Sequence, residues 1–103
     1  MNRLRLAAAA LNQTPLAWDL NRRPVLAAIA AARDEGVGVL CLPELCLSGY
    51  GCEDMFHAPG VQQTALEMLV ECLPETGGMA VCLGLPVFFE GAVYNTAALA
   101  CDG

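Results

Sequence analysis

Glu44 is the residue whose type and position best fit chemistry in this sequence. It follows the apolar run 37–42 (VGVLCL) and Pro43, and the loop 48–51 (SGYG) comes shortly after it. A carboxylate at the end of a buried strand is costly unless it is paired, exposed at an edge or used in a reaction. Desolvation there would suit it to act as a general base near neutral pH. From position alone a second interpretation stays open, a loop carboxylate that caps a backbone N–H.

The other reactive side chains are six cysteines and one histidine. Cys41, Cys72, Cys82 and Cys101 lie within apolar runs, where a free thiol behaves as a small hydrophobic side chain. No CxxC motif or Cys/His metal spacing occurs, and His57 has no partner acid or nucleophile spaced for catalysis. We therefore expect reduced, buried cysteines, no metal site and a surface position for His57.

Glu44 would be positioned by a strand, a helix and a second strand. Residues 5–12 are predicted to form a buried strand, and residues 21–35 a helix. The run 37–42 is apolar on both faces, which suits a central parallel strand covered on both sides. Such a βαβ unit is expected to be right-handed. Glu44 then lies at the carboxyl edge of the sheet, where ligands of open α/β sheets gather.

Local signals set the ends of the first helix. Asn21 can act as its N-cap, with Pro24 in the first turn, where a missing N–H costs little. Gly36 fits the position just after the last helical residue, where a left-handed conformation is usual. The helix is therefore expected to begin near Asn21 and to end near residue 35.

A second helix and a hairpin follow. The helix begins at residue 59 and stops before Pro74. Residues 79–89 and 92–101 are predicted to be strands joined by a tight turn at Glu90-Gly91. The helix residues expected to face inward are Val61, Ala65, Leu66, Met68, Leu69 and Cys72.

Composition limits the class of protein. A chain of 103 residues has room for one small domain or part of a larger one. Its hydrophobic fraction of 56% excludes a disordered tail. The net charge is −6, and all five cations are arginines, so the basic stripe of a nucleic-acid binder is missing. No apolar stretch approaches the ~20 residues of a membrane span. We expect a cytoplasmic protein with no nucleic-acid or membrane partner.

The segment around Glu44 resembles a known signature. Residues 42–45 (LPEL) followed by 48–50 (SGY) are similar to the Pro-Glu-(x)4-Gly-Tyr signature of the nitrilase, or carbon–nitrogen hydrolase, superfamily. The continuation 51–56 (GCEDMF) looks most like one branch, the glutaminase domain of glutamine-dependent NAD⁺ synthetases. Further segments agree in order: 12–13 (NQ), 18–20 (WDL), 84–86 (GLP) and 94–96 (YNT).

The resemblance implies a catalytic site of one glutamate, one lysine and one cysteine. The cysteine thiolate attacks the amide carbon of glutamine, ammonia leaves, and a thioester remains. By this resemblance Glu44 is the general base, the lysine stabilises the oxyanion, and Tyr50 lines the glutamine pocket. A tyrosine packed over the loop with a hydrated hydroxyl is an equally open interpretation of Tyr50. The sequence contains no lysine, so we expect residues 1–103 to be the N-terminal part of such a domain, unable to complete the triad alone.

Cys52 imitates the missing nucleophile. The segment 52–56 (CEDMF) has the shape of the family's Cys-Glu-Asp-x-aromatic nucleophile segment. The family's segment follows a buried strand, whereas Cys52 follows a glycine-rich loop eight residues after Glu44. We therefore expect Cys52 not to be catalytic.

The expected fold class is α/β, the first part of the nitrilase αββα sandwich, in the order β-α-β-α-β-β. The resemblance implies no cofactor in this domain, and ATP and Mg²⁺ for a synthetase domain further along the protein. It also implies glutamine as substrate and a homo-oligomer at full length. Two alternatives remain: a stand-alone amidase for a small ω-amide or carbamoyl compound, and a non-catalytic α/β interaction module.

Overall fold

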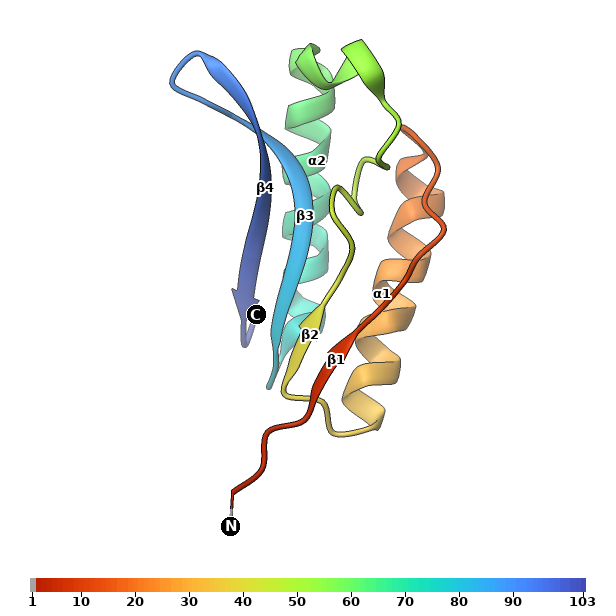
Figure 1. The fold of residues 1–103 in the computed structure, drawn as a ribbon, viewed down its shortest axis with the longest axis vertical. Coiled ribbons are helices and arrows are strands. Elements are labelled where there is room, and N and C mark those ends of the chain that lie inside the picture. Colours follow the sequence, from red (N-terminus) through yellow and green to blue (C-terminus); the bar gives the residue numbers. More distant parts are fainter. Residues whose placement is uncertain (1) are drawn as a thin grey trace.

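The computed structural model describes residues 2–103, and Met1 lies outside the described residues. The predicted order β-α-β-α-β-β is confirmed (Figure 1). Two short 3-10 segments, η1 and η2, flank the second helix. The bounds are β1 (Leu6–Ala8), α1 (Trp18–Asp34), β2 (Val39–Cys41), η1 (Glu53–His57), α2 (Pro59–Cys72), η2 (Leu73–Thr76), β3 (Ala80–Phe89) and β4 (Ala92–Cys101).

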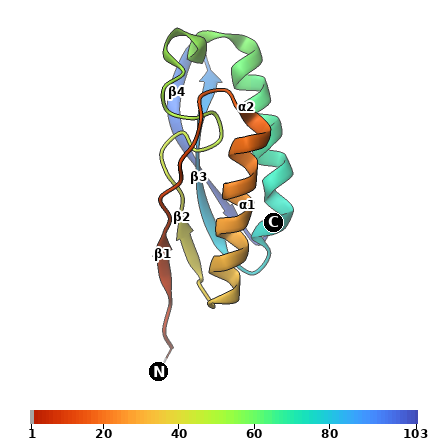
Figure 2. The same cartoon turned by 90° about the vertical axis from the view of Figure 1, so that its right-hand side faces the viewer.

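The strands form one sheet in the order β1-β2-β3-β4. The first three are parallel, and β4 returns antiparallel to β3 through the turn at Glu90-Gly91. Both helices lie on the same side of this sheet (Figure 2). The described residues therefore form two layers, and the other face of the sheet, called the open face below, is uncovered. The core lies between the helices and the sheet, around Ile29, Leu40 and Leu83.

Helix α1 begins earlier than predicted, and Asn21 does not cap it. The helix starts at Trp18, and the capping position is Ala17, which makes no side-chain cap hydrogen bond. Asn21 is buried within the helix, and Pro24 is also internal. The C-terminus is as expected: Gly36 has φ +72°. Hydrogen bonds from its N–H to Arg33 and from the Val37 N–H to Ala32 close a Schellman motif.

The strands β1 and β2 are shorter than the predicted runs 5–12 and 37–42. Pro43 has no N–H to donate, so the ladder of β2 ends with the bond from Leu42 N to Cys82 O, at 3.0 Å. β1 pairs only with β2, and after Ala8 one further bond, Ala9 N to Cys41 O, joins them. The expectation of a strand covered on both faces is wrong for the described residues, because Cys41 is exposed on the open face.

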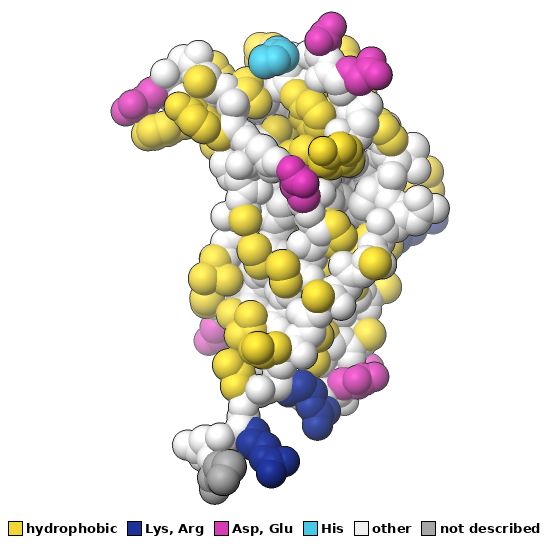
Figure 3. Space-filling model, in the orientation of Figure 1, with side chains coloured by type: hydrophobic (Ala, Val, Ile, Leu, Met, Phe, Trp, Pro, Cys, Tyr) yellow, Lys and Arg dark blue, Asp and Glu magenta, His cyan; other side chains and the backbone are white. Residues whose placement is uncertain are grey.

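The open face is apolar. Hydrophobic side chains gather over the sheet face turned towards the viewer (Figure 3). Leu6 and Leu99 are 67% and 66% exposed there. Three of the four cysteines expected to be buried are not: Cys41 and Cys101 are exposed and Cys82 is half-buried, because they lie on strands that lack a second layer. All six thiols are free, as predicted.

Helix α2 packs its predicted face against β3, with one exception. Val61, Ala65, Met68 and Cys72 are buried, whereas Leu66 is exposed.

None of the helices that the structure describes is long and apolar enough to cross a membrane.

Candidate active site

Glu44 lies in a turn that follows β2 and packs against the open face of β3 at Gly84. Leu45, the next residue, adopts φ +51°, a left-handed conformation that is unusual for a residue with a side chain. Backbone bonds fix the segment after Glu44, from Leu47 N to Gly84 O at 3.2 Å and from Gly49 N to Leu45 O at 2.9 Å. Glu44 itself is exposed, so the desolvation expected from its position after a buried strand is absent in the described residues. Its carboxylate is ready to meet solvent or a ligand.

Gly84 on β3 makes room for this turn. A Cβ at Gly84 would lie 2.3 Å from Leu45 N and 2.7 Å from Pro43 O, closer than real Cβ contacts come. The backbone around Glu44 therefore lies directly on a strand position that has no side chain.

The Glu44 carboxylate is hydrogen-bonded by Asn95. The Asn95 Nδ2 group, on β4, donates to Glu44 Oε1. The sequence indicates no role for Asn95, although the segment 94–96 (YNT) is part of the resemblance. The signal was too weak, because the two residues are 51 positions apart and only the folded sheet brings them together.

The carboxylate opens into a groove of about 370 Å³ on the open face. The end of β2, the turn that follows it, and the facing parts of β3 and β4 line this groove. Its residues are Cys41, Leu42, Pro43, Glu44, Cys82, Gly84, Asn95, Thr96 and Ala97. Glu44 is the one carboxylate among them, so an acid–base role in this groove falls to it.

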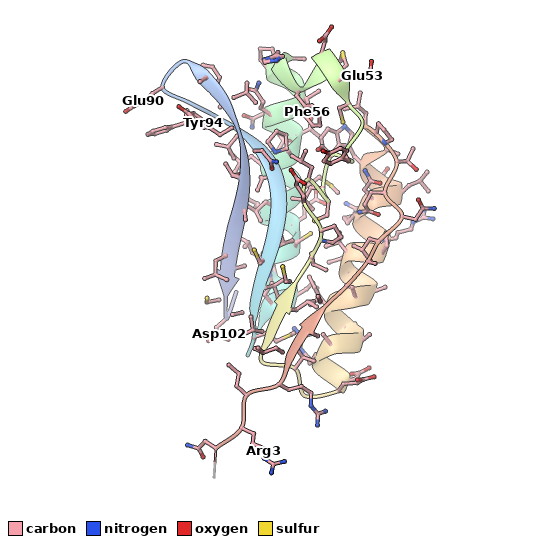
Figure 4. All side chains as sticks on the ribbon, in the orientation of Figure 1. Arg3, Glu53, Phe56, Glu90, Tyr94 and Asp102 are labelled. Atoms are coloured by element: carbon pink, nitrogen blue, oxygen red, sulfur yellow. The ribbon has the colours of Figure 1, made fainter. Side chains whose placement is uncertain are left out.

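A smaller hollow of about 210 Å³ adjoins the groove and shares Asn95 with it. Phe56 from η1 and Tyr94 from β4, both labelled in Figure 4, contribute aromatic rings to it. Leu45 and Pro86 line the same hollow. His57 also lines it. A mainly apolar space beside a carboxylate groove could take the carbon chain of a small ligand.

Tyr50 does not line the groove in the described residues. It is 68% exposed in the loop that follows the Glu44 turn. The loop itself is held closely, because a Cβ at Gly49 would lie 2.8 Å from both the Cα and the N of Pro15. A contact between Tyr50 and a ligand stays a prediction.

Cys52 is a packed side chain. It is buried, and its thiol donates to the carbonyl oxygens of Ser48 and Gly49, both at 3.3 Å. A thiol engaged with two carbonyls and closed off from solvent is poorly placed to attack a substrate. His57 is exposed at the end of η1, as expected for a surface residue.

A network of side-chain amides, Gln13 and Asn21, holds the loop that follows Glu44. Asn21 is 1% exposed, accepts a bond from Thr14 N at 2.8 Å, and donates to Thr14 O and Leu47 O at 2.8 and 3.2 Å. Gln13 Nε2 donates to Asn21 O and to Cys46 O, at 2.9 and 2.7 Å. These bonds join the loop between β1 and α1, helix α1 and the loop after Glu44 into one unit. This explains why Asn21 is buried rather than at a helix cap.

Neighbouring chemistry does not suggest a metal. Among residues 2–103, no group of three or more His, Cys, Asp or Glu side chains is arranged to hold one.

Burial raises the pKa of the Cys46 thiol to about 11, so this thiol, just beyond the turn, stays protonated near neutral pH.

Glu44 follows the carboxyl end of β2 in an α/β sheet, which is the position that the sequence predicted for it. The chain belongs to the carbon–nitrogen hydrolase family, whose profile matches residues 5–102. The match covers almost the whole chain, including every element that positions Glu44.

Within that family the chain is similar to glutamine-dependent NAD(+) synthetases. The chain is 40% identical over 97 residues to a glutamine-dependent NAD(+) synthetase from Oryza sativa subsp. indica, covering 92% of this chain and 13% of the relative. It superposes on the crystal structure of a glutamine-dependent NAD(+) synthetase from Cytophaga hutchinsonii with a TM-score of 0.94 and 42% identity, covering 96% of this chain and 17% of that one. The chain therefore spans less than a fifth of either relative.

A more distant likeness is limited to the fold. An amidase from Nesterenkonia sp. superposes with a TM-score of 0.76 and 24% identity, over 96% of this chain and 38% of that one.

Proposed function

We propose that this chain is the amino-terminal part of a glutamine-hydrolysing amidase domain that supplies ammonia for NAD⁺ synthesis from deamido-NAD⁺ and ATP. The observation that carries the proposal is Glu44, exposed in an open groove and bonded by Asn95, in a chain 40% identical to a glutamine-dependent NAD(+) synthetase. The position of Glu44 supports its role as a general base, and the similarity to the synthetase supports glutamine as the substrate.

In this proposal Glu44 is the general base. It takes the proton of a cysteine thiol, and the thiolate attacks the side-chain amide carbon of glutamine to give a tetrahedral oxyanion. A lysine ammonium stabilises that oxyanion. Glu44 returns the proton to the leaving nitrogen, ammonia departs and a thioester remains. Water, deprotonated by Glu44, then cleaves the thioester to glutamate and restores the thiol.

The lysine and the nucleophilic cysteine come from other parts of the protein in this proposal. The sequence has no lysine, and Cys52 is buried and bonded to loop carbonyls. ATP and Mg²⁺ belong to a synthetase domain elsewhere in the same cytoplasmic protein, which assembles as a homo-oligomer. Within this domain we propose that glutamine is the ligand and that no cofactor takes part.

The alternative within the family is a stand-alone amidase for a small amide or carbamoyl compound. The likeness to the Nesterenkonia amidase supports the shared fold, but at 24% identity it says nothing about the substrate. The higher identity to two NAD(+) synthetases favours glutamine.

The test uses the complete protein that contains residues 1–103. Glutamate release and NAD⁺ formation are measured with deamido-NAD⁺, ATP and Mg²⁺, and with either glutamine or ammonium as nitrogen donor. We expect Glu44→Gln to abolish glutamine-dependent NAD⁺ formation and to leave ammonium-dependent formation intact. Glu90→Gln, at the hairpin tip, is the matched control and should leave both intact. Hydrolysis of other small amides without NAD⁺ formation would favour the stand-alone amidase, and no amide hydrolysis at all would favour a non-catalytic module.

A further inference from the structure

We propose that Asn95 is a positioning residue for Glu44, which holds one carboxylate oxygen so that the other is presented to the reacting groups. This inference rests on the proposed function and extends it to a residue with no assigned role. Asn95 donates to Glu44 Oε1, and no described side chain bonds Oε2. One oxygen is therefore anchored and the second is available for proton transfer.

The hydrogen bond joins a residue that follows β2 to a residue on β4, two strands away in the sheet. Glu44 follows β2, whereas Asn95 lies on β4, where it pairs with Pro86 of β3. β3 lies between them. The turn can lie this close to β3 because Gly84 offers no side chain there. The Glu44–Asn95 hydrogen bond thus depends on the missing Cβ of a third residue.

The donor comes from a rigid element. Asn95 is within a ten-residue strand that pairs with β3 along its full length. Its neighbour Thr96 further ties β4 to β3, because the Thr96 hydroxyl donates to Leu85 O at 2.7 Å. A side chain on a strand is held more precisely than one on a loop, which suits a group that must aim another.

The amide orientation follows from chemistry. An ionised carboxylate only accepts hydrogen bonds, so the Asn95 amide must turn its NH₂ group towards Glu44. An amide has no charge to gain or lose near neutral pH, so this anchor persists across the working range. A lysine or histidine at position 95 would instead add a charge to the groove.

Two consequences separate this role from a merely structural one. A donor to a carboxylate favours its charged form, so removing the donor should move the acid limb of the pH–rate profile to higher pH. A base that is free to rotate should also lose efficiency in proton transfer while substrate binding is little changed. The loss should therefore fall on kcat rather than on KM.

The experiment compares Asn95→Ala, Asn95→Asp and Asn95→Gln in the complete protein, with glutaminase kinetics measured between pH 5 and 9. For Asn95→Ala we expect kcat to fall about 10- to 100-fold, the loss of a hydrogen bond to a charged group. We expect the acid limb to move upward. Asn95→Asp keeps the shape but places a second carboxylate beside Glu44, so the limb should move further. Asn95→Gln keeps an amide donor and should recover part of kcat.

Gln63→Ala is the matched control. Gln63 Nε2 donates to Glu67 Oε1 at 3.2 Å on the surface of α2, so this variant also removes an amide-to-carboxylate bond, but on the helix side of the sheet rather than on the open face. It should leave kcat and the pH limb unchanged. Ammonium-dependent NAD⁺ formation should persist in every folded variant.

The outcomes are distinguishable. If the parent protein hydrolyses glutamine and Asn95→Asp or Asn95→Ala keeps its kcat and acid limb, the positioning role is overturned while the proposed function stands. An equal loss in kcat for all three variants with an unmoved limb would overturn it as well. If the parent protein hydrolyses no glutamine, the proposed function itself fails. Should Asn95→Ala not fold, the isosteric Asn95→Asp decides.

Discussion

A Cβ placed on Gly84 would lie 2.3 Å from the backbone nitrogen of Leu45, which is shorter than any real non-bonded contact of a Cβ atom. The neighbouring carbonyl of Pro43 and carbonyl carbon of Glu44 would be 2.7 and 2.9 Å away. All these atoms belong to backbone, which cannot swing aside as a flexible side chain can. The position of the candidate base is therefore coupled to one glycine on the neighbouring strand.

Gly84→Ala should destabilise the protein and displace the Glu44 turn. Overpacking against backbone costs about 1–3 kcal/mol of the free energy of unfolding, or more. Urea denaturation followed by circular dichroism measures this. Gly60→Ala is the control, because a Cβ there meets nothing within 4 Å and lies in helix α2, where alanine is favoured. A Gly84→Ala variant as stable as its parent would show that the turn does not lie on β3 as described.

Asn21→Ala should also be strongly destabilising. It removes the partner of Leu47 O from a buried bond and the partner of Thr14 N and Thr14 O from part-buried ones, and an unsatisfied buried polar group costs about 1–3 kcal/mol. We expect a loss of about 2 kcal/mol or more, measured as the shift in the urea midpoint. Asn12→Ala, an exposed position, should change the free energy of unfolding by no more than about 0.5 kcal/mol. Equal losses in the free energy of unfolding for Asn21→Ala and Asn12→Ala would show that the hydrogen bonds of Asn21 do not stabilise the fold.

The sequence was sufficient for the element order, the hairpin and Gly36 as a helix-ending residue, because local turn chemistry and apolar periodicity decide them. It was not sufficient for Asn21. A polar residue ahead of a helical run fits an N-cap, and nothing local shows that the loop after Glu44 will come back to accept its hydrogen bond. Cys41 and Leu66 were misjudged for a related reason: their exposure depends on which layers cover each face.

The candidate site divides in the same way. Glu44 could be found from a strand end and a short signature, both local in sequence. Its contact with Asn95 and its passage over Gly84 could not, because strand register brings these residues together over 40 to 51 positions. Pairing partners at that separation leave no periodic trace in a single sequence.

Tyr50 can be tested in the complete protein. If Tyr50 contacts bound glutamine, Tyr50→Ala should raise KM for glutamine about tenfold, the loss expected when a buried aromatic contact of 1–1.5 kcal/mol is removed. Tyr50→Phe keeps the ring and should retain most of the affinity unless the hydroxyl itself binds. Phe89→Ala, an exposed aromatic at the end of β3 that lines neither the groove nor the smaller hollow, is the comparison. Unchanged KM in Tyr50→Ala would leave Tyr50 as a surface residue of the loop.

Alkaline pH should weaken the fold through two buried thiols. Burial raises the pKa of Cys46 and of Cys72 from 9.0 to about 11. Between these values the two thiols ionise in the unfolded chain but stay protonated in the folded chain. Ionisation therefore lowers the free energy of the unfolded state relative to the folded state. The contribution to stability is complete below pH 9 and is lost as the pH rises towards 11. Urea midpoints measured from pH 8 to 11 should fall more steeply in the parent than in Cys72→Ala.

Alkylation rates separate packed from accessible thiols. Cys41 and Cys101 are exposed, whereas Cys46, Cys52 and Cys72 are buried. In the folded 103-residue chain at pH 7.5, iodoacetamide should therefore modify Cys41 and Cys101 first, as located by peptide mass spectrometry. Cys52, held by two loop carbonyls, should react more slowly than either by about tenfold or more until urea unfolds the chain. Cys101→Ser should remove one fast site and leave the Cys52 rate unaltered. Rapid, selective modification of Cys52 in the folded chain would make it a reactive thiol eight residues from the Glu44 turn, and would reopen its role as a nucleophile.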